Sequence, residues 1–134
     1  MKAQIQRLLN QIQDKGDFSK VAVLLEEKPW AIIDESGAIQ KLIFRRNKDL
    51  ILSINGKAQV GKWDFFVEAR SLLIDRVQDK ILCNIKFADE FVMILQLDGR
   101  IEQFQFLVNQ NRLPSLDPLS YLEDLRRKKL KLKP

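Results

Sequence analysis

The feature that most constrains the fold is an alternation of apolar and polar residues, with a period of two, that runs from Trp30 to Asn109. Turn-forming residues interrupt this alternation at short intervals. The turn signals are Ser36-Gly37, Asn47-Lys48-Asp49, Asn55-Gly56, 67–70, Gln78-Asp79, Ala88-Asp89 and Asp98-Gly99. They predict eight strands at about residues 30–35, 39–46, 50–55, 58–66, 71–77, 80–87, 90–97 and 101–109. No long helical segment interrupts the run, so we expect a mainly β, eight-stranded antiparallel up-and-down meander, as a barrel or a strongly curved sheet.

Single strands show which side chains are expected to share a face. In the last strand, Phe104, Phe106 and Val108 form the apolar row, opposite Gln103 and Gln105. An antiparallel meander with one main buried face explains such rows, so we expect the phenylalanines to face the core.

The segments on either side of the meander are expected to be helical. Ile5, Leu8, Leu9 and Ile12 have amphipathic helical spacing, and Gly16 is a suitable stop. Residues 18–28 fit a helix or a strand, and helix is favoured. Near the C-terminus, Asp117 is a suitable N-cap and Pro118 a suitable first helical residue, and the leucines that follow are expected to dock on the body. The predicted organisation is a single domain, 1–134. Its parts are an N-terminal helical segment 3–28, the β-meander 30–109 and an amphipathic C-terminal helix 117–130 with a basic tail.

A meander of eight strands leaves two edges exposed unless it closes into a barrel. Here the chain resembles lipocalin-like small bacterial domains, through "LLEEKPWAIID", "KLIFRRNKDLIL", "GKWDFF" and "SLLID", over about residues 24–76. Pro29 stands where a glycine often precedes the tryptophan. The later "DKILCN", "VMILQLDG" and "YLEDLRRKKL" are similar to an uncharacterised family of small bacterial proteins without an assigned activity. The resemblance implies a β-barrel with a cavity for an apolar ligand.

Four residues are candidates for ligand binding. Trp30 and Trp63 are either walls of a cavity or core residues. The core interpretation is favoured, because strands of about seven residues span only about 23 Å and an eight-stranded barrel is readily filled by side chains. Arg70 and Arg76 flank "SLLID" with an even separation, so they could share an inward face and clamp a carboxylate. A solvated, outward pair is the favoured alternative.

The net charge of +5 comes from the C-terminal tail, "RRKKLKLKP". Its six basic residues are Arg126, Arg127, Lys128, Lys129, Lys131 and Lys133. Subtracting them from 23 leaves 17 basic against 18 acidic residues in 1–125, a net charge of −1. The tail could bind nucleic acid, an anionic membrane or an acidic partner, although a solubilising helix end is the simpler interpretation.

Histidine is absent and Cys83 is the only cysteine, which excludes His-based triads, His-based acid–base catalysis and an internal disulfide. The candidates for carboxylate chemistry are the pairs Asp34–Glu35, Asp75–Asp79 and Asp89–Glu90. The favoured interpretation is that these acidic residues are solvated charges at turns. We expect no enzyme activity, cofactor or metal. A cytoplasmic location is expected, because neither a signal peptide nor a membrane span is recognisable.

The sequence therefore predicts a non-enzymatic binding or interaction module that contacts a protein partner, a second copy of itself or a small apolar ligand. A continuous apolar cavity of roughly 300 Å³ or more would favour the ligand. One alternative is association with nucleic acid or an anionic surface through the basic tail. A carboxylate-based hydrolase or isomerase is the other.

Overall fold

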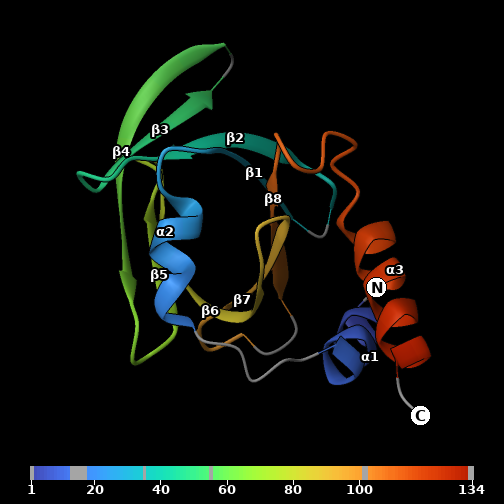
Figure 1. Cartoon of the computed structure of the whole chain (residues 1–134). Coiled ribbons are helices and arrows are strands. Elements are labelled where there is room, and N and C mark those ends of the chain that lie inside the picture. The colour runs from blue at the N-terminus through green and yellow to red at the C-terminus, as the bar shows by residue number, and fades with distance from the viewer. Residues whose placement is uncertain (1, 13–17, 35, 55, 101–102, 133–134) are drawn as a thin grey trace.

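The protein is a closed β-barrel with helices across one end and along one side (Figure 1). The computed structural model describes residues 2–12, 18–34, 36–54, 56–100 and 103–132. The strands are β1 (Pro29–Ile33), β2 (Ile39–Phe44), β3 (Asp49–Ile54), β4 (Lys57–Phe66), β5 (Ser71–Asp75), β6 (Lys80–Ala88), β7 (Val92–Leu97) and β8 (Phe104–Asn109). Each is antiparallel to its neighbours in the chain, and β1 also pairs with β8, so the ring is closed. The predicted eight-stranded up-and-down barrel is confirmed. The predicted features at Gly16, Glu35, Asn55 and Lys133 lie outside the described residues.

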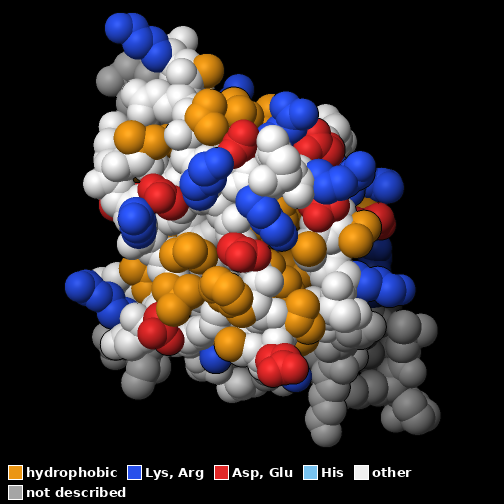
Figure 2. All heavy atoms as spheres, turned by 90° about the vertical axis from the view of Figure 1, so that its left-hand side faces the viewer, with side chains coloured by type: hydrophobic (Ala, Val, Ile, Leu, Met, Phe, Trp, Pro, Cys, Tyr) orange, Lys and Arg blue, Asp and Glu red, His pale blue; other side chains and the backbone are white. Residues whose placement is uncertain are grey.

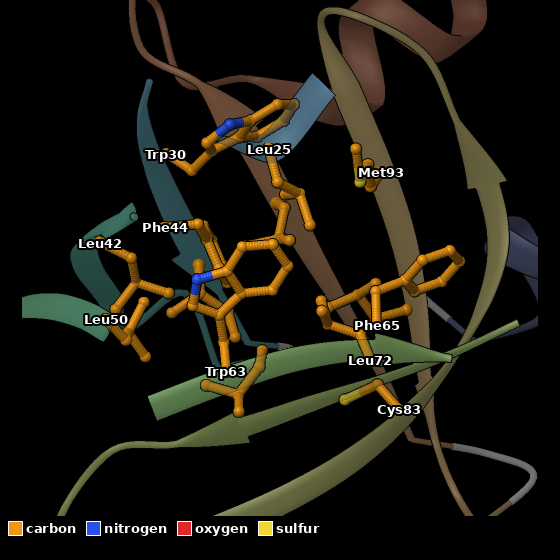
Figure 3. Close-up of a cluster of buried hydrophobic side chains, with 14 of the residues drawn as sticks. Leu25, Trp30, Leu42, Phe44, Leu50, Trp63, Phe65, Leu72, Cys83 and Met93 are labelled. Carbon is orange, nitrogen blue, oxygen red and sulfur yellow. The ribbon is translucent and has the colours of Figure 1, made fainter. Parts of the chain in front are cut away.

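The barrel interior is filled by large apolar side chains (Figure 3). Trp30 and Trp63 are 0% and 1% exposed, so both are core residues. This confirms the favoured interpretation of the two tryptophans. The Trp63 ring meets Phe44 edge-on at 5.4 Å, and its Nε1 donates to the carbonyl oxygen of Arg45 at 2.8 Å. Leu42, Leu50, Leu72 and Met93 complete much of the packing around them.

A short helical segment covers the end of the barrel at which β1 begins. It consists of the 3-10 turn η1 (Phe18–Lys20) and α2 (Val21–Leu25), which confirms helix rather than strand for 18–25. Val21 and Leu25 are buried in the interior cluster, so α2 acts as a plug. The chain then pairs with β2 through an isolated bridge between Glu26 and Phe44.

A second apolar core lies outside the barrel. There α1 (Lys2–Ile12) and α3 (Pro118–Leu132) lie side by side against the wall (Figure 1). Ile5, Leu8 and Leu9 of α1 and Leu122 of α3 are buried against outward residues of β1, β7 and β8. Asp117 caps α3 as predicted, since its Oδ1 accepts from the Ser120 N–H at 3.1 Å.

This outer core corrects the expected orientation of β8. Phe104, Phe106 and Val108 point outwards, beneath the helices, whereas Leu107 belongs to the interior cluster. The prediction of one main buried face failed because the helices bury the outer face of β8 as well. A bulge between Ile85 and Phe87 likewise turns Phe87 to the outer core. Consequently Gln105, which was expected to face solvent, points into the barrel.

Candidate functional site

The end of the barrel opposite α2 contains a pocket of about 220 Å³, which we call the mouth. Residues from three strands and two turns line it: Ile32, Asp34, Ala38, Ile39, Gln40, Arg76 and Gln105. Inward-facing positions at this end are polar, whereas those deeper in the barrel are apolar. The mouth therefore brings hydrogen-bonding groups together around a volume smaller than that of most small-molecule sites.

Arg76 supplies the positive charge of the mouth. It follows β5 directly, and its side chain is only 19% exposed. Its Nε and Nη2 donate to the two carboxylate oxygens of Asp79 at 2.8 and 2.7 Å. Nη1 reaches Gln40 Oε1 at the long distance of 3.5 Å. Asp79 thus holds one edge of the guanidinium. Nη1, whose bond to Gln40 is long, remains available to donate to an acceptor at a shorter distance.

Gln105 supplies an unpaired acceptor. Its Oε1 is buried and has no hydrogen-bond partner among the described residues. A buried acceptor without a donor costs free energy, typically about 1–3 kcal/mol. Gln105 lines the mouth, so a rotation of its side chain would bring this acceptor to an N–H or O–H group of a ligand and recover that cost. Sequence reasoning missed Gln105 because its alternation with phenylalanines suggested a solvent-facing position.

Asp34 brings a negative charge, but one of its carboxylate oxygens is already engaged. Its Oδ1 accepts from Ser36 Oγ at 2.6 Å, from the Ser36 N–H at 2.9 Å and from the Ala38 N–H at 3.0 Å. The Ser36 hydroxyl, followed by these backbone bonds, lowers the pKa of the Asp34 carboxyl in spite of some burial. Asp34 therefore stays ionised and shapes the β1–β2 turn.

The turn that carries Arg76 is strained. Val77 has φ +74°, a left-handed conformation that β-branched residues rarely adopt. Hydrogen bonds hold it there, from the Val77 N–H to Asp75 Oδ1 at 3.1 Å and from the Arg76 N–H to the Asp79 carbonyl oxygen at 2.8 Å. These bonds fix where Arg76 leaves the strand and thus where its guanidinium lies.

A second hollow of about 220 Å³ lies outside the barrel, between the β1–β2 turn and the start of α3. Its polar side chains are already used, because Asp34 holds its own turn and Asp117 caps α3. The mouth is the better candidate site, since it contains an unpaired acceptor.

The other predicted ligand-binding residues do not join the mouth. Arg70 lies at the plugged end of the barrel, where its guanidinium stacks over Phe18 at 4.6 Å. The structure therefore does not bring Arg70 and Arg76 together, because they stand at opposite ends of β5. Trp30 and Trp63 lie in the packed interior, not in the lining of the mouth.

The predicted carboxylate pairs are held by structural contacts. Asp89 accepts from the Phe91 and Val92 N–H groups, and the hydroxyl of Tyr121 donates to its other oxygen. Glu90 pairs with Arg112 at 3.4 Å. Burial, followed by the bond to Asp89, raises the pKa of the Tyr121 hydroxyl. These contacts tie α3 to the β6–β7 turn.

Cys83 is fully buried in the interior, as predicted. Burial raises the pKa of its thiol to about 12, although the nearby charge of Arg76 acts in the opposite direction. At neutral pH the thiol is protonated and a poor nucleophile. Among the residues that the structure describes, no three His, Cys, Asp or Glu side chains are grouped as they would be around a metal ion.

The predicted basic tail is part of α3, which continues to Leu132. Arg126 pairs with Glu123 at 3.0 Å, and its Nη1 contacts Gln11 of α1 at 3.5 Å. Arg127 pairs with Asp124 at 3.2 Å. The tail thus begins inside a helix that packs on the body.

The face formed by β3, β4 and β5 carries grouped apolar side chains in its lower half, with charges of both signs above them (Figure 2). Along these strands, Val60 is 57% exposed, and Phe66 at the end of β4 is 45% exposed. A protein partner or a second copy of the chain would find apolar contacts on this surface. Binding of such a partner stays a prediction.

No protein-family model, curated protein or solved structure matches this chain. What the structure establishes is the class: a closed, antiparallel, up-and-down β-barrel with eight strands, compatible with a lipocalin-like fold. None of the described helices is both long and apolar enough to pass through a bilayer.

Proposed function

We propose that the protein is a non-enzymatic binding module that holds a small, neutral, polar molecule in the mouth of its barrel. The observation that carries this proposal is the buried, unpaired Oε1 of Gln105 beside the available Nη1 of Arg76. Together they offer an acceptor and a donor to one ligand, as an amide-like group requires.

Charge and volume narrow the class of ligand. Asp34 lines the mouth and Asp79 is paired with Arg76, so a carboxylate ligand would meet negative charge there and a cation would meet the guanidinium. A pocket of about 220 Å³ holds only a small molecule. The apolar ligand expected from the sequence is disfavoured, because tryptophans and other large side chains fill the described interior.

Neutral, anionic and cationic probes of equal size test the ligand class. Binding of 2-pyrrolidinone, cyclopentanecarboxylate and cyclopentylammonium to the full chain would be followed by NMR, through the side-chain amides of Gln40 and Gln105 and the Nε–H of Arg76. We expect saturable shifts with the lactam and much weaker shifts with the two ions. Shifts with the carboxylate alone would assign an anion site, and no saturable shift with any probe would reject the mouth as a site.

Two variants separate binding from folding. Gln105→Leu and Arg76→Gln should each weaken lactam binding about tenfold, because each removes one hydrogen bond to the ligand. Gln105→Leu should leave the free energy of unfolding unchanged or higher, because it removes an unpaired buried acceptor. Arg100→Gln is the control, since Arg100 is exposed on the β7–β8 turn at the same end without lining the mouth. Equal affinity in all three variants would contradict the proposal.

A further inference from the structure

The net positive charge of the protein lies on its two outer helices. α1 contains Lys2 and Arg7 and no acidic residue, a net charge of +2. α3 contains five basic residues, 126–129 and Lys131, against Glu123 and Asp124, a net charge of +3. These sum to the +5 of the whole chain, and the remaining 16 basic and 16 acidic residues cancel. Segments from opposite ends of the sequence thus carry the excess positive charge of the molecule.

The fold places these helices together. They lie side by side on the barrel wall, and Arg126 of α3 contacts Gln11 of α1 (Figure 1). Ile5, Leu8 and Leu9 of α1 are turned to the barrel and are at most 4% exposed. The exposed residues whose side chains are described are polar: Gln4, Gln6, Arg7, Asn10 and Gln11 on α1, and Ser120, Asp124, Arg127 and Lys128 on α3, where Asp124 pairs with Arg127. Amides, guanidinium and ammonium groups are the donors that contact phosphate oxygens in nucleic-acid complexes.

We infer that the α1–α3 face binds the phosphate backbone of a nucleic-acid duplex without reading its bases. Insertion into a membrane is disfavoured, because the described outward residues of α1 offer no apolar side chain. Stacking on unpaired bases is also disfavoured. Tyr121, the single aromatic residue of the two helices, is stacked on Phe91 and bonded to Asp89. This site is distinct from the mouth and does not depend on the proposed ligand.

Fluorescence anisotropy of the full chain with a labelled 20-base-pair duplex tests the inference between 20 and 200 mM KCl. We expect weak binding whose affinity falls with salt, with a slope of about −0.9 for each phosphate contacted. The double variant Arg7→Gln/Lys128→Gln should weaken binding at the lowest salt about tenfold and make the slope shallower by up to about 1.8. Both side chains are exposed, so the variant should unfold at the temperature of the unsubstituted protein.

A charge-matched control separates a face from overall charge. Lys41→Gln/Lys57→Gln removes the same two charges from exposed positions on β2 and β4. It should bind the duplex as the unsubstituted protein does. Equal weakening by the two double variants would overturn the inference. No binding at 20 mM KCl, preference for single strands, or binding to phosphatidylserine vesicles but not to the duplex would also overturn it.

Discussion

Gly61 shows how one residue allows the barrel to bend. It lies in β4 opposite Leu50, and a β-carbon added there would stand 1.9 Å from the carbonyl oxygen of Asp75. The structure identifies the neighbour as backbone, which unlike a flexible side chain has little freedom to move.

Gly61→Ala should lower the free energy of unfolding by about 2 kcal/mol or more, because β4 and β5 must separate to make room. Urea unfolding of the purified variant measures this. Gly99→Ala is the comparison. Gly99 has open space around it, so alanine there is strained only by the φ of +75°, which costs about 1 kcal/mol of stability. A smaller loss at Gly61 than at Gly99 would show that the close approach to Asp75 does not exist.

The elements divide between those that build the wall and those that cover it. The strands follow from the two-residue alternation and the turn signals. The plug is predicted less firmly, because residues 18–28 fit a helix or a strand on pattern alone, with helix favoured. At the barrel end, Val21 and Leu25 are buried while Val23 between them is 65% exposed. A helix allows this pattern, whereas a strand would turn all three side chains to one face.

Substitutions on the plug should depend strongly on which side of α2 they fall. Leu25→Ala should destabilise the protein by about 2–5 kcal/mol, because it leaves a cavity in the interior cluster. Val23→Ala on the same helix should cost no more than about 0.5 kcal/mol, since Val23 is 65% exposed. Thermal or urea unfolding of both variants gives the difference. Similar losses for the two would mean that α2 does not plug the barrel.

At the scale of the whole molecule, closure by β1 and β8 removes the two exposed edges that a meander would leave. Closure also turns Gln40, Arg76 and Gln105, which are distant in sequence, towards one opening. The mouth exists only because the ring is complete.

Hydrogen exchange tests this closure directly. Some backbone amides of residues 30–33 and 106–109 donate hydrogen bonds across the β1–β8 seam. Their exchange rates should lie within about tenfold of the rates of amides in the centres of β3 and β4. The exposed start of β4, at Lys57 and Ala58, should exchange faster and serves as the reference for fraying. Seam amides that exchange as fast as this reference would indicate an open sheet.

The sequence by itself determined the eight strands, their antiparallel order, the capped C-terminal helix and the core positions of both tryptophans. These depend on local alternation, turn residues and caps, which act over a few neighbouring residues. Only the tertiary structure decided that Phe104 and Phe106 face the helices while Gln105 faces the barrel. A strand with apolar residues on both sides can face either way until the helices that cover it are in place. For the same reason, Arg76 could be assigned to the mouth, and Arg70 excluded from it, only once the ring had closed.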